Sequence, residues 1–282
     1  MRRVIDFHIH VGDLMMLRND IQNLLYTHKK RQDFDIEVLF NEPKELVKYI
    51  QEQGVYKGVI LAEEGPGTNF HITTEFIADY YKRGESDVLI PFGCINPNTT
   101  EDVVAAYKKA IKMGIKGFKL YPADHDFNPN SKELFEVYRL MEEDELPLMF
   151  HTGSTAQVDG NSEYCAPLIF EPILKKFPKL NVVFAHSGRP NHYREAEMLT
   201  RKYENCYLET ALVRPKDFVK NFPNVEEFSE KIIFGSDWPG VMSLSTLIKD
   251  YEECGLSEEA LDNLFYRNAA KLLKLVQTES VK

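Results

Sequence analysis

The chain has 282 residues, of which 43% are hydrophobic and 28% are charged, and its formal net charge is −10. This length and apolar content are enough for one sizeable domain with its own core. The acidic balance argues against a nucleic-acid surface, which needs a basic patch, and against a global field that attracts anionic substrates.

Membrane and secretory signals are also missing from the sequence. No stretch approaches the roughly 18 apolar residues of a membrane span. The start, at Met1, lacks the long apolar run and cleavage site of a signal peptide. The four cysteines are scattered without a C-x-x-C pair, and Cys94 and Cys206 lie in strand-like runs where buried free thiols are expected. We therefore predict a reducing, cytoplasmic compartment.

Short apolar runs alternate with amphipathic stretches along the whole chain. The apolar runs predict eight strands, near residues 3–9, 57–62, 88–94, 115–120, 147–151, 181–186, 205–209 and 231–235. Apolar residues at helical spacing predict intervening helices over residues 101–112, 132–142 and 244–254. Strands that alternate with such helices indicate a parallel sheet. Eight units of this kind favour a closed (β/α)8 TIM barrel, an α/β fold, over an open doubly wound sheet.

Residues 11–43 depart from this rhythm. The segment mixes charged residues with apolar ones and is far longer than a usual βα loop of about 2–6 residues. It begins next to His10, at the end of the first strand. We predict a single domain over residues 1–282, in which residues 11–43 form a cap or lid over the site. An insertion that packs only against the barrel exterior or a partner subunit is the alternative.

The first strand is predicted to alternate regularly. His8 and His10 would then point into the barrel, and Phe7 and Ile9 would face the surrounding helices. Asp6 shares the inward face one layer deeper. There it would pair with a cation or bond to a ligand histidine, unless its role is purely structural.

Four of the predicted strands end in a residue that can bind a transition metal. His8 and His10 end the first strand, and His151, His186 and Asp237 end three others. These ends meet at the C-terminal rim, where such barrels carry out their chemistry. Each residue alone has a simpler explanation, such as a core histidine bonded to a carbonyl or an aspartate that caps a helix. Together, imidazoles and a carboxylate favour zinc, with manganese or iron as alternatives.

Five segments together resemble the amidohydrolase superfamily, in particular its amidohydrolase-2 group, which includes aminocarboxymuconate-semialdehyde decarboxylase. They are "IDFHIH", "FHTG", "FAHSG", "IIFGSDWP" and "LFYRNAAKLLKL", and the similarity runs from residue 4 to about residue 275. The resemblance implies a (β/α)8 barrel with a metal at its C-terminal rim. It assigns His8, His10, His151 and Asp237 as ligands of one metal. It assigns His186 as the histidine that activates the metal-bound water, so that His186 and Asp237 are the predicted catalytic residues.

Lys119, in "GFKLYP", lies where a carboxylated lysine bridges two metals in binuclear relatives. The amidohydrolase-2 group usually works with one metal, so the resemblance implies one divalent ion, with Zn²⁺ favoured and Mn²⁺ or Fe²⁺ as alternatives. We therefore interpret Lys119 first as a substrate-binding cation. If Lys119 were carboxylated, a second metal would bind and His186 would become one of its ligands.

Rim residues with polar or cationic side chains suggest how a substrate is held. The predicted substrate-binding residues are Lys119, Tyr121, Arg189 and Trp238. Further polar candidates, most of them expected to be solvated loop residues, are Glu63, Glu64, His125, His192, Glu209 and Arg214. Cations in an otherwise acidic protein suit a small carboxylate-bearing substrate. The predicted partner is therefore a small molecule, without nucleic acid or membrane, and a homodimer is expected only by analogy with related barrels.

Three functions compete. The first is a metal-dependent hydrolase of a small amide, lactone or ester that works through a metal-activated water. The second is a metal-dependent decarboxylase or hydratase of an unsaturated carboxylic acid, which would use the same ligands. The third is a barrel that only binds a ligand, against which the complete ligand set speaks. A phosphoesterase would tend to supply more histidines and a D-x-H pair, whereas Asp237 is followed by Trp238 and Pro239.

Overall fold

The computed structural model describes residues 2–19, 22, 23, 25, 34–65, 71–155, 157, 160–241 and 243–275. Eight strands form one parallel sheet in the order β1-β2-β5-β6-β7-β8-β9-β10. Their bounds are β1 (Ile5–His10), β2 (Lys57–Leu61), β5 (Leu89–Gly93), β6 (Gly117–Leu120), β7 (Leu148–His151), β8 (Val182–Ala185), β9 (Cys206–Glu209) and β10 (Ile232–Ile233). All eight predicted strands are present.

The sheet closes between its first and last strands. The Phe7 amide donates to the Phe234 carbonyl at 2.9 Å, and the Asp237 amide donates to the His8 carbonyl at 2.9 Å. The His10 amide donates to the Trp238 carbonyl at 2.7 Å. These bonds continue β10 along β1, so the structure confirms the predicted (β/α)8 barrel.

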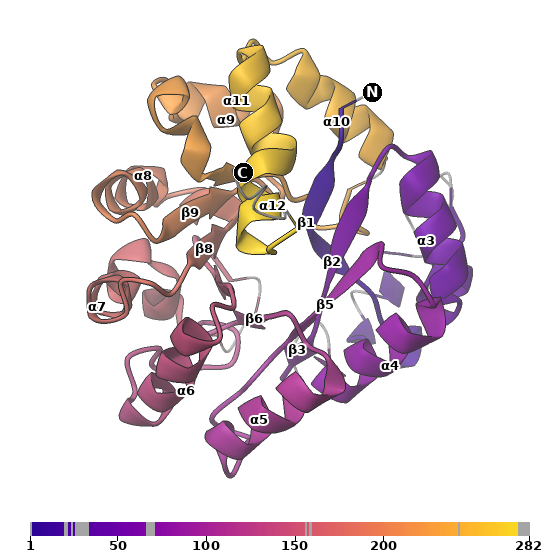
Figure 1. The fold of residues 1–282 in the computed structure, drawn as a ribbon, viewed down its shortest axis with the longest axis vertical. Coiled ribbons are helices and arrows are strands. Elements are labelled where there is room, and N and C mark those ends of the chain that lie inside the picture. Colours follow the sequence, from indigo (N-terminus) through magenta and orange to yellow (C-terminus); the bar gives the residue numbers. More distant parts are fainter. Residues whose placement is uncertain are drawn as a thin grey trace, which may run out of the picture.

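Helices surround the strands (Figure 1). Their bounds are α2 (Ile36–Asn41), α3 (Pro43–Glu52), α4 (Thr74–Gly84), α5 (Val103–Met113), α6 (Lys132–Glu143), α7 (Glu171–Lys176), α8 (Tyr193–Lys202), α9 (Pro215–Asn221), α10 (Leu244–Glu252), α11 (Glu258–Asp262) and α12 (Asn268–Leu272). The three predicted helices correspond to α5, α6 and α10. Helix α5 begins where Asp102 accepts the Val104 and Ala105 amides and ends at Gly114, whose φ of +98° suits glycine. A short hairpin of β3 (Glu63–Glu64) and β4 (His71–Ile72) was not predicted.

Side chains alternate between two apolar cores. The outer core lies under the helices, and the inner core fills the barrel with residues such as Phe7, Val59, Phe92 and Met149. Ala269, Ala270 and Leu272 of α12 join the inner core and close one end of the barrel. The inner core thus leaves the opposite, C-terminal end of the strands for polar side chains.

A bulge in β1 corrects the predicted alternation. Asp6 pairs with Gly58 and Ile9 pairs with Ile60, so β1 has one more residue than β2 over this stretch. Phe7 therefore faces the barrel interior, where its ring lies 5.4 Å from that of Phe92, whereas Ile9 faces the helices as predicted. Because of the bulge, the consecutive residues Phe7 and His8 both serve the barrel interior: Phe7 fills its core and His8 lies at its rim.

The contacts of Asp6 agree with the second of its two predicted roles, a purely structural one. It is fully buried and accepts bonds from the His8 amide at 3.1 Å, from the Ser236 amide at 3.0 Å and from the Ser236 hydroxyl at 2.6 Å. These bonds stabilise the bulge and fasten β1 to the segment that carries Asp237.

The predicted lid lies partly outside the described residues, which omit 20, 21, 24 and 26–33 of its range. The rest contains a short helical turn (Leu14–Met16) and α2. Arg18 donates to the Gln157 side chain at 2.6 Å, and the Phe34 ring lies 5.1 Å from that of Trp238. The insertion therefore contacts the loops that follow β7 and β10. That it closes over the site stays a prediction.

Two compositional expectations concern buried thiols and membrane spans. Cys94 and Cys206 are buried free thiols, as predicted. Among the residues that the structure describes, no helix combines the length and apolar character needed to cross a membrane.

Candidate active site

Polar side chains from six neighbouring strands meet at the C-terminal end of the barrel. The strand ends supply His8 and His10 from β1, Lys119 from β6, His151 from β7, His186 after β8, Glu209 from β9 and Asp237 after β10. Lys119 pairs in register with Met149, a residue of the inner core, so both point inward. The same alternation turns His151 and Glu209 toward the barrel axis.

Three ligand atoms converge at the centre of this rim. His8 Nε2 lies 3.2 Å from His10 Nε2, and each of these nitrogens lies 3.0 Å from Asp237 Oδ1. His8 is fully buried and His10 is 7% exposed. Such spacing between lone-pair atoms suits a shared cation, since zinc binds imidazole nitrogens at about 2.0–2.1 Å. The residues present therefore fit the divalent metal that was predicted.

His186 extends this group. Ligand atoms of His8, His186 and Asp237 all lie within 4.8 Å of one another. The His186 ring is centred 5.0 Å from that of His8. A candidate metal site of two histidines and an aspartate is thus present, and His10 lies against it.

The protonation states favour cation binding. Burial lowers the pKa of His10 to about 4, so its imidazole is neutral at neutral pH. Burial raises the pKa of Asp237, but the adjacent His8 and His10 imidazoles, which bond to its carboxylate, hold that pKa well below its usual value. A carboxylate and a neutral imidazole are the forms that ligate metals.

The backbone at His186 turns its side chain into the site. Ala185 belongs to the inner core, so regular alternation would direct His186 outward. His186 and Ser187 instead have φ values of +64° and +51°. His186 Nδ1 donates to the Ala211 carbonyl at 3.1 Å, which leaves Nε2 as the acceptor of the neutral ring. Burial, followed by the charge of His151, lowers the pKa of His186 well below its usual value and keeps the ring neutral.

His151 lies beside this group without offering a nitrogen to it. Its ring is 4.7 Å from that of His186. Its Nε2 donates to the Ser154 carbonyl at 2.8 Å, and its Nδ1 lies 4.0 Å from Asp124. The Thr155 hydroxyl donates to the same Asp124. His151, which was predicted as a metal ligand, is thus held by the loop after β7, close to the site.

Lys119 reaches the centre of the site. It is 1% exposed, and its Nζ lies 2.6 Å from His8 Nε2 and 4.7 Å from the centre of the Tyr121 ring. Burial lowers the pKa of Lys119 from its ordinary value, although the nearby carboxylates oppose this. The ammonium is thus placed to contact a substrate anion beside the metal ligands.

The other predicted substrate-binding residues differ in placement. Tyr121 is buried, donates to the Ala62 carbonyl at 3.2 Å and stacks on His151 at 6.2 Å. Arg189 is partly buried near His186, and its Nε has no hydrogen-bond partner within the described residues. Trp238 is fully buried against Phe34, so its ring faces the insertion rather than the histidines.

Of three further polar candidates, Arg214 is exposed, His192 is half-buried and His125 is buried. Arg214, whose side chain is 83% exposed, bonds to Asp217, and His192 Nδ1 lies 3.3 Å from Glu195. His125 was expected to be solvated but is only 7% exposed, with a ring 5.3 Å from that of Tyr121. Neither ring nitrogen of His125 has a partner in the described part of the chain. An unpaired buried imidazole at the rim makes His125 a candidate substrate contact.

Glu209 is the residue whose position sequence reasoning missed. It was treated as a polar rim candidate, but it is fully buried and its Oε2 lies 3.2 Å from His8 Nδ1. Its place at the end of an apolar run, like that of the ligand residues, was the available signal.

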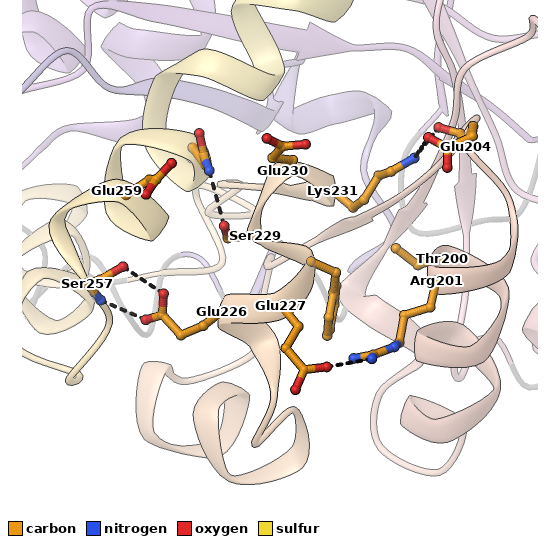
Figure 2. A pocket seen from close by; sticks show the side chains of 12 residues that line it. Thr200, Arg201, Glu204, Glu226, Glu227, Ser229, Glu230, Lys231, Ser257 and Glu259 are labelled. Atoms are coloured by element: carbon orange, nitrogen blue, oxygen red, sulfur yellow. Dashed lines mark hydrogen bonds and ion pairs between the residues drawn. The ribbon is translucent and has the colours of Figure 1, made fainter.

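A pocket of about 570 Å³ lies at the other end of the barrel. It is lined by residues such as Glu204 and Lys231, which precede β9 and β10. Figure 2 shows its polar side chains bonded to one another, for example Arg201 to Glu227 and Ser257 to Glu226. This N-terminal face of a barrel serves stability, so the candidate active site is the histidine cluster.

Comparison with known proteins decides the family. A family model described as Amidohydrolase matches residues 5–275. The chain belongs to the amidohydrolase family. Within it, the match is to the amidohydrolase-2 group, as the resemblance implied. The match extends over nearly the whole chain, from the first strand to the end of α12 and beyond.

Curated relatives of this amidohydrolase include dihydroorotases. The chain is 24% identical to the dihydroorotase of Acinetobacter baumannii over 189 aligned positions, and the match covers 64% of this chain and 48% of that protein. It is 25% identical to the dihydroorotase of Photorhabdus laumondii over 194 residues, again 48% of the relative. The chain spans about half the length of the curated relatives it matches.

Solved structures similar to this amidohydrolase confirm the fold. An uncharacterized TIM-barrel protein from Bordetella bronchiseptica has a TM-score of 0.78 and 18% identity, with 96% of this chain and 98% of that chain covered. A 2,6-dihydroxybenzoate decarboxylase bound to 2,6-dihydroxybenzoate has a TM-score of 0.69 and 14% identity, with 97% and 98% covered. A probable 2-pyrone-4,6-dicarboxylic acid hydrolase from Acinetobacter baumannii, with citric acid bound, has a TM-score of 0.69 and 16% identity, with 96% and 99% covered.

Proposed function

We propose that this protein is a metal-dependent hydrolase of a small amide, lactone or ester that carries a carboxylate. The convergence of His8 Nε2, His10 Nε2 and Asp237 Oδ1 within 3.2 Å of one another supports this proposal most directly. These residues would hold one divalent cation, with Zn²⁺ favoured by the imidazole content. His151 would become a further ligand only by turning its Nε2 away from the Ser154 carbonyl. When bound, the cation supplies positive charge that acidifies a water molecule and polarises a substrate oxygen.

His186 and Asp237 manage the proton in this proposal. The neutral His186 ring has its Nδ1 engaged with the Ala211 carbonyl, so its Nε2 accepts a proton from the attacking water. The same nitrogen returns that proton to the leaving group. Asp237 remains ionised and orients the water through its carboxylate. Burial of all these groups excludes bulk water and strengthens their electrostatic effects.

Cationic side chains at the rim support a carboxylate-bearing substrate. Lys119 lies in the site, and Arg189, whose amide bonds to the His186 carbonyl, has a buried Nε without a partner among the described residues. A guanidinium and an ammonium are the groups that proteins use to bind carboxylates. The 2,6-dihydroxybenzoate and 2-pyrone-4,6-dicarboxylic acid named for two structural neighbours are both carboxylate compounds.

Decarboxylation or hydration of an unsaturated carboxylic acid is the second candidate, because the same residues serve it and a structural neighbour is a decarboxylase. A panel of small lactones, cyclic amides and unsaturated dicarboxylates separates the two. Ring opening with uptake of water supports hydrolysis, whereas release of carbon dioxide supports the alternative. Full metal occupancy with no turnover of any panel member, together with tight binding of one, would instead show a binding protein.

Lys119→Met tests the substrate-binding cation. We expect kcat/KM for carboxylate substrates to fall by about 10–100-fold, because a hydrogen bond to a charged group contributes about 1.5–3 kcal/mol. Metal content should stay at one equivalent. The matched control is Lys57→Met, a buried lysine at the opposite end of the barrel that bonds to Asp87. A drop from two metals to one in Lys119→Met would show instead that Lys119 is a carboxylated bridge.

A further inference from the structure

The Glu209 carboxylate connects the segments that build the candidate metal site. Its Oε2 lies 3.2 Å from His8 Nδ1 and accepts the His186 amide at 3.1 Å. Its Oε1 accepts the Ala211 amide at 2.7 Å. One fully buried side chain thus fixes β1, the turn after β8 and the turn after β9 relative to one another.

Gly235, in the segment that follows β10, leaves room for the Glu209 carboxylate. A Cβ added at Gly235 would lie 1.6 Å from Glu209 Oε1 and 2.9 Å from His8 Cβ, so a larger residue there would displace the carboxylate. The Ser187 hydroxyl donates to the Glu209 carbonyl at 2.8 Å and holds the backbone there. The position of the carboxylate is therefore set by several contacts at once.

The chemistry of this contact determines which His8 nitrogen faces the metal. Both Glu209 oxygens accept backbone amide protons, from His186 and Ala211, so His8 Nδ1 is the donor in its contact with Oε2 and carries the proton. In a neutral imidazole the lone pair is then on Nε2, the atom that faces His10 and Asp237. A second hydrogen bond that orients a metal-binding histidine in this way commonly raises metal affinity.

We propose that Glu209 is a positioning residue that holds His8 in the Nδ1–H form, so that Nε2 is available to the cation. This inference rests on the proposed function, because it presumes a metal at His8. Glu209 does not itself contact the metal or the substrate. It acts through His8 and, by way of the His186 amide, through the turn that directs His186 inward.

Glu209→Gln is the variant that tests this role. The amide has nearly the same shape but offers one oxygen, whereas the three donors need both carboxylate oxygens. If the NH₂ group faces His8, it favours the other tautomer, in which Nε2 carries the proton and cannot ligate. We expect the dissociation constant for Zn²⁺ to rise by about 10–100-fold, the usual effect of removing such a partner. Competition with a chromophoric chelator measures it.

Thr210→Val is the matched control. Thr210 is the next residue after Glu209 and its hydroxyl bonds across to Gly235, at 3.1 Å from the amide and 3.3 Å from the carbonyl. The control thus perturbs the same strand end without touching His8. We expect its Zn²⁺ affinity to stay within about twofold of wild type.

The outcomes separate this inference from the proposed function. Wild-type protein that binds no Zn²⁺ overturns both. Wild-type and Glu209→Gln proteins with equal Zn²⁺ affinity overturn the role of Glu209 and leave the metal site standing. Weaker binding in Glu209→Gln together with unchanged binding in Thr210→Val supports the inference.

A second measurement does not require the variant to fold. His8 Nδ1–H and the His186 amide point at the same Glu209 oxygen, so their protons lie close together. In Zn²⁺-loaded wild-type protein with ¹⁵N-labelled histidine, we expect a protected ring N–H resonance with a nuclear Overhauser contact to the His186 amide. A spectrum without a histidine ring N–H near that amide would overturn the inference.

Discussion

Asp237→Ala protein is expected to be purified without its metal and without activity. Asp237 Oδ1 is the atom that both His8 Nε2 and His10 Nε2 approach at 3.0 Å, and it brings the negative charge that balances the cation. Loss of a residue that only orients a ligand costs about 10–100-fold in metal affinity, so loss of the ligand itself should exceed about 100-fold. Metal content by mass spectrometry and kcat/KM on the best panel substrate measure the two effects.

The control for this variant is Asp79→Ala, an exposed aspartate on α4 whose side chain is 68% exposed. It should retain wild-type metal content and activity. A fully active Asp237→Ala enzyme would contradict the assignment of Asp237 as ligand. His8→Ala is expected to behave as Asp237→Ala does, because it removes the nitrogen at the centre of the same cluster.

His186→Asn is expected to retain the metal but lose turnover. Asparagine tolerates the φ of +64° at this position better than alanine does, and its amide can still donate toward the Ala211 carbonyl. It cannot accept and return a proton at neutral pH. General acid–base catalysis contributes about 10²–10⁴-fold, so kcat should fall by that factor. Steady-state kinetics and metal analysis of one preparation test both parts.

His192→Asn serves as the control, since this nearby histidine lies against Glu195 and is partly solvated. Its kcat should stay within about twofold of wild type. If metal content also fell in His186→Asn, the grouping of His186 with His8 and Asp237 within 4.8 Å would reflect direct ligation rather than acid–base duty. That result would favour the binuclear arrangement with a carboxylated Lys119.

The strands and their order were predictable because each is a short apolar run between amphipathic stretches. The ends of these apolar runs also predicted where β7 and β10 end, and hence that His151 and Asp237 lie at one rim. Where the backbone leaves regular geometry, such predictions fail. The extra residue in β1 turned Phe7 inward, and the positive φ at His186 reversed the direction that alternation predicts.

Contacts between distant segments could not be predicted in the same way. Glu209 and His8 are 201 residues apart in the sequence, and no local pattern shows that one bonds to the other. Trp238 follows Asp237 directly, yet alternation and the apolar insertion carry it out of the site and against Phe34. Residue type at a strand end thus indicated the chemistry, whereas pairing and orientation required the fold.

The rim of this barrel is expected to hold one divalent cation. Anomalous diffraction at the metal edge, from crystals of protein purified without chelators, tests it directly. We expect one peak, ligated by His8 Nε2, His10 Nε2 and Asp237 Oδ1. A map with no peak at the rim, or with the ion bound away from these three atoms, would contradict it.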